Sequence, residues 1–384
     1  METVSRVAFV SHFLLMFGYK LFSFFFPLYL VKLGLSLPAV GYTYLLIYLP
    51  IALFAPVVGA LNSKTRPIHF MLLGIAGYAA YSLVMMAAHP PAVFYVMQVV
   101  LGLSAACFFV SVRSLLARAE LPHLDRTFGY FYAAPNAAEV LAPAVGAAVI
   151  FFFGFPGVFL VSLAVHLANI LYVTLQRRVV QIVRQAAPPL PSREAYREFG
   201  KKVLGHAWPL LLPSFVVLVV GGIYQPFFVL FLEHLGWSQN MILLYGAVFS
   251  ALFVPISWVV ARYALQQRSS RNVYGGSLLY AAGSFVFGIL SHRLEFVGIL
   301  TLAALRGAGA LSANSGRSAF LSRSSKTSEP AAVIDTMLSP LGTAFGALAG
   351  GYLLTQVDFG SLFTQAGALV AAVVSLSLLF KRSQ

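Results

Sequence analysis

The sequence predicts an all-α integral membrane protein, with about twelve transmembrane helices arranged as two pseudo-repeated six-helix bundles. The chain is 60% hydrophobic and only 9% charged, whereas a soluble domain carries about 25% charged residues. Its apolar runs are continuous and about twenty residues long, the length that a helix needs to cross hydrocarbon. Barrel strands would instead alternate in polarity over about ten residues. The backbone N–H and C=O groups must therefore make their hydrogen bonds within helices.

The apolar runs divide into two sets of six. The first set is expected at 7–31, 38–61, 67–87, 91–117, 127–153 and 156–176. The second set is expected at 207–232, 239–263, 273–291, 295–321, 330–355 and 359–380. A polar stretch separates them, and a short amphipathic surface helix is expected in it from Ser192. This predicts an N-terminal bundle at 1–176, a cytoplasmic linker at 177–206 and a C-terminal bundle at 207–384.

The distribution of charge predicts the orientation. The net charge is +14, but most of the 25 Lys and Arg fall in loops on one side. Of the loops on the other side, only those with Lys32 and Arg293 carry a basic residue. Because basic loops stay inside, we expect both termini in the cytoplasm, lipid headgroup contacts and no nucleic-acid partner. The one cysteine, Cys107, excludes a disulfide framework. Short loops and the lack of a targeting signal favour a bacterial inner membrane.

The two halves repeat each other in sequence. Leu33-Gly34-Leu35-Ser36 recurs as Leu235-Gly236-Trp237-Ser238, and Arg113-Ser114 recurs as Arg317-Ser318. Gly146 likewise matches Gly350. All three pairs lie about 200 residues apart, as expected for an internal duplication.

Three loose motifs resemble those of the major facilitator superfamily, in the family's order. They are Gly59–Arg66 between spans two and three, Gln98–Gly102 in span four, and Ala142–Ala147 in span five. Ser63 stands where the first motif has Asp. The resemblance covers nearly the whole chain and implies two bundles that rock around a central cavity, exposing a substrate site alternately to each side.

Ionisable residues inside spans are the main candidates for function, because each costs about 2.5–3.5 kcal/mol at mid-helix on insertion scales. Lys20 lies in span one, Glu139 in span five and Arg306 in span ten. The resemblance places Lys20 and Arg306 on the cavity from opposite halves, where they would bind an anion. Glu139 would carry the coupling proton. The alternative is a Lys20–Glu139 pair that only pins helices together.

Polar residues near these charges are further candidates for substrate contact. Tyr224 and Gln225 follow Gly221-Gly222 and precede Pro226, where we expect span seven to be interrupted. Tyr19 and Asn136 would complete the substrate-binding set.

A third group is expected at the inner gate. Arg113 and its repeat Arg317 lie near the inner ends of their spans, and Asp335 is the expected partner of Arg317. Lys64 and Arg66 lie in the first family motif. The alternative for the arginines is simple snorkelling to the membrane interface.

These observations favour a proton-coupled secondary transporter of a small organic, anionic solute, working as a monomer without cofactor or metal. The alternative is an exporter or flippase of amphiphilic drugs or lipids. An intramembrane enzyme is a distant third, since the sequence has neither a His-Glu-x-x-His zinc motif nor a Gly-x-Ser-x-Gly elbow.

Overall fold

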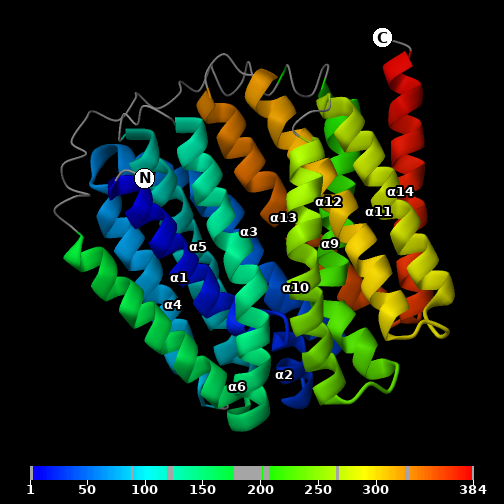
Figure 1. Cartoon of the computed structure of the whole chain (residues 1–384), viewed down its shortest axis with the longest axis horizontal. Coiled ribbons are helices and arrows are strands. Elements are labelled where there is room, and N and C mark those ends of the chain that lie inside the picture. The colour runs from blue at the N-terminus through cyan, green and yellow to red at the C-terminus, as the bar shows by residue number, and fades with distance from the viewer. Residues whose placement is uncertain are drawn as a thin grey trace. The chain divides into compact units, whose positions relative to one another are not determined.

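The computed structural model describes residues 3–87, 90–118, 124–176, 201, 207–264, 268–324 and 328–382. Within these ranges the chain forms helices and no strand (Figure 1). The helices are α1 (Thr3–Ser23), α2 (Phe26–Lys32), α3 (Leu37–Lys64), α4 (Pro67–Met85), α5 (Pro91–Arg118), α6 (Leu124–Leu175), α9 (Trp208–His234), α10 (Gln239–Ala264), α11 (Ser269–Leu290), α12 (Phe296–Ser324), α13 (Ser328–Leu353) and α14 (Phe359–Arg382). The predicted linker helix lies outside the described residues.

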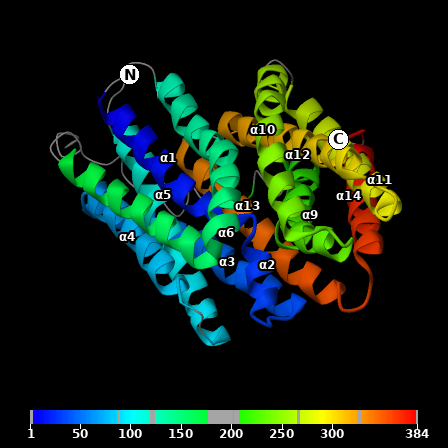
Figure 2. The same ribbon diagram turned by 60° about the horizontal axis from the view of Figure 1, so that its bottom comes forward.

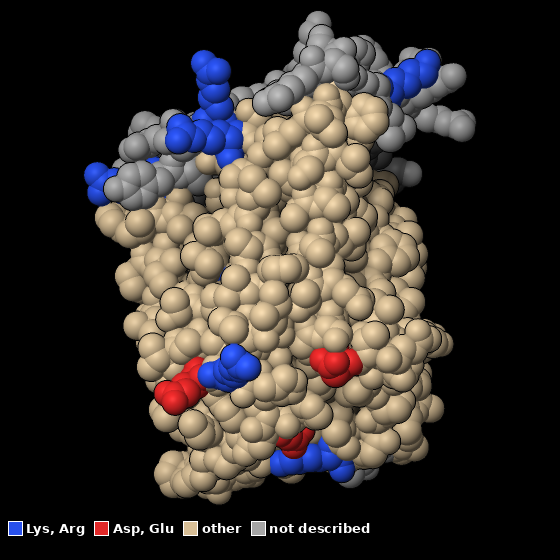
Figure 3. Space-filling view, turned by 90° about the vertical axis from the view of Figure 1, so that its right-hand side faces the viewer, with Lys and Arg blue, Asp and Glu red and all other residues tan. Residues whose placement is uncertain are grey.

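The helices have the length and apolarity of membrane spans. Nine of the described helices are long enough and apolar enough to span a membrane, and α1 together with α2 would make a tenth span. On the face shown in Figure 3, Lys, Arg, Asp and Glu lie near the two ends and leave a broad uncharged belt. Helices α11 and α14 carry exposed apolar side chains, among them Leu279, Phe285, Leu376 and Leu379. The prediction of an all-α integral membrane protein is confirmed.

The fifth and sixth predicted spans form one continuous element. Helix α6 contains a single non-helical residue, Gly154, at φ 68° and ψ −171°. A side chain would be strained at this φ, so glycine permits the reversal. The predicted boundary between the spans 127–153 and 156–176 is therefore present, and α6 supplies two of the twelve predicted spans.

The first predicted span is bent. Helix α1 ends at Ser23, and α2 starts at Phe26 at an angle of 41° to it. Pro27 stands at the start of α2, and because it has no N–H it cannot bond the Ser23 carbonyl. The break places Lys20 in the last turn of α1 rather than in the middle of a straight span.

The expected interruption of span seven is wrong. Helix α9 runs without a break from Trp208 to His234, although Pro213 and Pro226 lie inside it. A proline does accompany a break in the first half, where Pro27 stands at the start of α2.

The chain divides into two compact units. Unit 1 consists of Met1–Leu35, Leu46–Leu190 and Ser238–Ala251, and unit 2 of Ser36–Leu45, Pro191–Trp237 and Leu252–Gln384. In unit 1, α1 packs along α6, and α4 packs on α5 and α6 (Figures 1 and 2). In unit 2, α9 packs along α13, and α11 lies between α12 and α14.

The sequence repeat corresponds to a repeated turn. Gly34 and Gly236 both have positive φ, 86° and 80°. After them, the N–H of Leu35 donates to the Leu30 carbonyl at 3.1 Å, and that of Trp237 donates to Leu232 at 3.2 Å. Both turns are therefore Schellman-type helix ends with glycine in the left-handed position.

Small residues bring paired helices close together in both units. A Cβ on Gly146 of α6 would collide with the Leu21 carbonyl of α1, and one on Gly346 of α13 would collide with the Val219 carbonyl of α9. Such contacts permit close helix approach in lipid. They fix α1 against α6 in unit 1 and α9 against α13 in unit 2.

Candidate functional site

Unit 1 contains an ion pair between α1 and α6. The Lys20 Nζ donates to Glu139 Oε1 at 2.7 Å. The two side chains are unequally exposed, at 22% for Lys20 and 57% for Glu139. The carboxylate thus keeps open acceptor positions, while its partner is largely covered.

The matching positions of unit 2 contain no charge. The repeat offset is 202 residues at Gly34 and Gly236 and 204 residues at Gly146 and Gly350. By these offsets Lys20 corresponds to Gly222 and Glu139 to Thr343. There α9 and α13 pack closely, since a Cβ on Gly222 would collide with the Thr343 backbone. A duplicated helix pair can therefore form without an ion pair, which weighs against a purely architectural role for Lys20 and Glu139.

A buried histidine lies beside this pair. His166 is fully buried, and neither of its ring nitrogens has a hydrogen-bond partner among the described residues. Its ring centroid lies 5.4 Å from that of Tyr78, which stacks edge-on against Tyr19 at 5.9 Å. A Cβ on Gly18 would lie 2.6 Å from His166 Cε1. Tyr19 therefore belongs to an aromatic wall next to Lys20.

Unit 2 contains a buried cation held by aromatic rings. Arg306 on α12 is 8% exposed and has no ion-pair partner in the described part of the chain. Its Cζ lies 3.1 Å from the centroid of Tyr224, 5.5 Å from that of Tyr280 and 5.9 Å from that of Phe287. Such cation–π contacts stabilise a desolvated cation by about 2 kcal/mol.

Polar atoms around Arg306 lie close together, Tyr280 against Arg306 and Tyr224 against Ser284, but without good hydrogen-bond geometry. Arg306 Nε, Tyr224 Oη, Tyr280 Oη and Ser284 Oγ are buried without a hydrogen-bond partner of standard geometry among the described residues. Unmade hydrogen bonds of buried groups cost about 1–3 kcal/mol each. The guanidinium and the three hydroxyls can together donate several hydrogen bonds to one anionic group.

The aromatic cluster itself is duplicated, but the cation is not. Tyr224 stacks on Phe363 at 4.2 Å in unit 2, and the matching pair in unit 1, Phe22 and Phe159, lies at 4.9 Å. By the same offset Arg306 corresponds to Gly102, which packs on the Ile47 carbonyl. The cluster forms in unit 1 without a cation, so packing alone does not explain Arg306.

A second arginine of α12 is fully compensated. Arg317 is 4% exposed. Its Nε donates to Asp335 Oδ1 at 2.9 Å, and Nη1 donates to Asn314 Oδ1 at 2.8 Å. Ser318 Oγ donates to Asp335 Oδ2 at 2.7 Å. The expected Arg317–Asp335 pair is therefore present and joins α12 to α13.

The remaining predicted residues are more scattered. Arg113 is half-buried on α5, and Arg66 is exposed before α4. Gln225 is exposed, unlike the adjacent buried Tyr224. The side chains of Asn136 and Lys64 lie outside the described part.

Tyr280, Ser284 and His166 were not predicted from sequence. Each is a single polar residue in an apolar run, and the signal available was burial at membrane depth rather than a motif. No group of three or more His, Cys, Asp or Glu among the described residues could hold a metal ion.

Comparisons with known proteins identify the family. The model of the Major Facilitator Superfamily matches residues 8–337. No curated protein matches the chain. Two crystal structures of POT family transporters are similar in fold. The complex with a thioalcohol-conjugated peptide has a TM-score of 0.77 at 14% identity, over 99% of this chain and 96% of that one. The complex with 5-aminolevulinic acid has a TM-score of 0.76 at 15% identity, with the same coverage.

A third structure has the same fold. It is a bacterial homolog of the human lysosomal transporter Spinster, in an inward-facing and unoccupied conformation, with a TM-score of 0.67 at 16% identity over 98% of this chain and 95% of that one. These identities establish the fold, and the family match covers most of the chain. This protein belongs to the Major Facilitator Superfamily of membrane transporters.

Proposed function

We propose that this transporter carries a small organic anion together with a proton. Arg306 binds the anionic group, and the Lys20–Glu139 pair couples its movement to protonation. The observation that carries the proposal is that Arg306 is 8% exposed and has no counter-ion among the described residues.

The energetics of Arg306 favour an anionic ligand. A mid-span arginine costs about 2.5–3.5 kcal/mol on insertion scales, and its aromatic contacts return about 2 kcal/mol. The net free energy of placing Arg306 at mid-span is therefore unfavourable without a ligand. An oxyanion would supply the missing charge and accept from Arg306 Nε and the hydroxyls of Tyr224 and Tyr280. The site is therefore incomplete in a way that an anion completes.

The ion pair offers a coupling mechanism. While Glu139 is ionised, it neutralises Lys20 at 2.7 Å. Protonation of Glu139 would break the pair and leave Lys20 as an available cation. The 57% exposure of the Glu139 side chain supports access of protons from water, since a mid-span carboxylate that faced lipid would carry a large penalty. Anion binding to Lys20 would thus be favoured only with a proton on Glu139.

Ligands named for proteins of similar fold are compatible with this chemistry. POT family transporters are described in complex with 5-aminolevulinic acid and with sulfate. Both ligands carry an oxyanion. We further propose that the bundles are 1–176 and 207–384, that the protein works as a monomer, and that both termini face the cytoplasm of a bacterial inner membrane.

Transport in proteoliposomes tests the proposal. Carboxylates, phosphates, short peptides and amphiphilic cations are compared with and without an inward proton gradient. We expect gradient-driven uptake of one anionic class. Arg306→Ala and Glu139→Gln should each reduce it at least tenfold, whereas Arg268→Gln, which removes an exposed cation of unit 2, should not.

The competing function has a distinct outcome. If amphiphilic cations or lipids are moved instead, and Arg306→Ala and Lys20→Ala leave the rate unchanged, the protein is an exporter or flippase. The two cations would then be scaffold, and the anion proposal would be wrong.

A further inference from the structure

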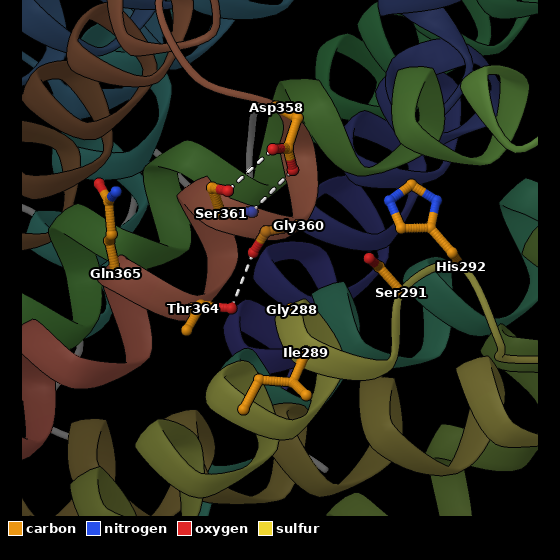
Figure 4. A pocket seen from close by; sticks show the side chains of 9 residues that line it. All are labelled: Gly288, Ile289, Ser291, His292, Asp358, Gly360, Ser361, Thr364 and Gln365. Atoms are coloured by element: carbon orange, nitrogen blue, oxygen red, sulfur yellow. Dashed lines mark hydrogen bonds between the residues drawn. The ribbon is translucent and has the colours of Figure 1, made fainter.

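A pocket of about 430 Å³ lies where α11 ends and α14 begins (Figure 4). Ser291 and His292 line it from the end of α11, and Asp358 and Ser361 line it from the start of α14. It lies at the end of unit 2 opposite to the C-terminus of α14. The anion site described above uses none of these residues.

The pocket is negative in character. Asp358 is the only Asp, Glu, Lys or Arg in its lining. Its Oδ1 accepts the Ser361 N–H and its Oδ2 accepts the Ser361 hydroxyl, both at 2.8 Å. These hydrogen bonds, the backbone one first, lower the pKa of the Asp358 carboxyl, so it stays ionised at neutral pH. The backbone N–H groups of Gly360 and Asp358 add to this lowering, so the carboxylate is held ionised at the first turn of α14.

Three oxygens converge beside Gly360. A Cβ placed on that glycine would lie 2.7 Å from Ser291 Oγ, 3.0 Å from the Gly288 carbonyl and 3.1 Å from Asp358 Oδ1. The Gly288 carbonyl lies in the last turn of α11, where the helix dipole is negative, and it accepts the Ser291 N–H at 3.5 Å. Glycine thus leaves three acceptors facing a common space.

One of these acceptors lacks a partner of its own. Ser291 is 1% exposed, and its Oγ has no hydrogen-bond partner among the described residues. Figure 4 shows this hydroxyl directed towards Gly360 and Asp358. A buried hydroxyl aimed at a carboxylate-lined pocket indicates that a polar partner is missing there.

We propose that this pocket binds a primary ammonium group. A primary ammonium has three N–H donors, which match the carboxylate, the hydroxyl and the helix-end carbonyl, and its charge complements Asp358. A calcium ion would require six to eight oxygens. Ile289, which lines the pocket, is 58% exposed and offers an apolar edge for an acyl chain. The ethanolamine headgroup of a phospholipid is therefore the ammonium source that fits best.

The test measures thermal stability of the full-length protein in nanodiscs. Phosphatidylethanolamine is compared with phosphatidylcholine of identical chains, because choline keeps the charge but has no N–H donors. We expect a higher Tm with ethanolamine lipid. Free ethanolamine is added to phosphatidylcholine discs as a second arm. A shift there means that the amine alone suffices, and a shift with the lipid only means that the headgroup must be anchored.

Two variants and a control separate binding from folding. Asp358→Asn keeps a helix-capping acceptor but removes the charge, and it should weaken ethanolamine-lipid binding about tenfold or more. Ser291→Ala should leave the Tm in phosphatidylcholine unchanged or higher, yet reduce the ethanolamine-specific shift. Glu295→Gln, an exposed carboxylate before α12, should retain the full shift.

Three results would overturn the proposal. The first is an equal Tm of the wild type in the two lipids. The second is an undiminished ethanolamine-specific shift in Asp358→Asn. The third is an equal stabilisation of the wild type by sodium or calcium chloride that Asp358→Asn abolishes, which would identify a metal-cation site instead.

Discussion

The guanidinium carbon of Arg306 lies 3.1 Å from the centre of the Tyr224 ring. The close approach depends on the neighbouring helix α11, where Gly283 leaves room for the arginine stem, since a Cβ there would lie 2.8 Å from Arg306 Cγ. The buried guanidinium is therefore stabilised by an aromatic face and not by a carboxylate. This contact is weaker than an ion pair, so a ligand can replace it.

Replacing this cation by an apolar chain should stabilise the protein. Arg306→Met removes an insertion cost of about 2.5–3.5 kcal/mol and loses cation–π contacts worth about 2 kcal/mol, so we expect a net gain of about 1 kcal/mol. Binding of the anion should be lost in the same variant. Thermal unfolding with and without ligand measures both effects. A marked loss of stability would instead make Arg306 a structural residue.

The Lys20–Glu139 pair should matter for transport more than for stability. Because the carboxylate is 57% exposed, the pair contributes at most about 1 kcal/mol. The double variant Lys20→Glu with Glu139→Lys keeps an ion pair between α1 and α6 but exchanges the positions of the two charges. We expect near wild-type Tm and at least a tenfold loss of anion uptake. Recovery of uptake in the exchanged variant would show that the pair only pins α1 to α6.

Asp335 should be essential for the stability of unit 2. Asp335→Ala leaves Arg317, which is 4% exposed, without its carboxylate, and breaking a buried pair costs about 3–5 kcal/mol. The double variant with Arg317→Met removes the orphaned charge and should be more stable than Asp335→Ala alone. Thermal unfolding of the two single variants and the double variant forms a cycle. Additive losses would contradict this account.

Sequence predicted the architecture because the bilayer imposes a simple rule on it. Length and apolarity locate helices such as α9 and α11, and the repeated Leu-Gly-x-Ser turn located Gly34 and Gly236 in equivalent positions. Intramembrane charge singled out Lys20, Glu139 and Arg306, and the structure pairs the first two and buries the third among aromatic rings.

Rotation and bending of helices could not be predicted in this way. Pro27 and Pro226 are both prolines in apolar runs, yet only Pro27 ends a helix, because tertiary packing decides whether a freed carbonyl is tolerated. Gln225 and Tyr224 are adjacent, but one is exposed and the other lies under Arg306. Tyr280 and His166 gave no local pattern at all.

The repeated turns allow a direct test of backbone strain. A Cβ on Gly34 or Gly236 would meet nothing within 4 Å, so any cost of alanine arises from the positive φ alone. We expect Gly34→Ala and Gly236→Ala each to destabilise by about 1–2 kcal/mol. Asparagine, which tolerates this conformation better, should cost less at both positions.

Gly275 is the matched control, because a Cβ there also meets nothing within 4 Å but the residue lies inside α11 with ordinary helical geometry. Gly275→Ala should stabilise by up to about 1 kcal/mol, from helix propensity. Thermal unfolding of the three alanine variants under one condition measures the difference. If all three shift the Tm in the same direction, left-handed geometry is not what selects glycine at the two turns, and the equivalence of the halves at Gly34 and Gly236 would need another cause.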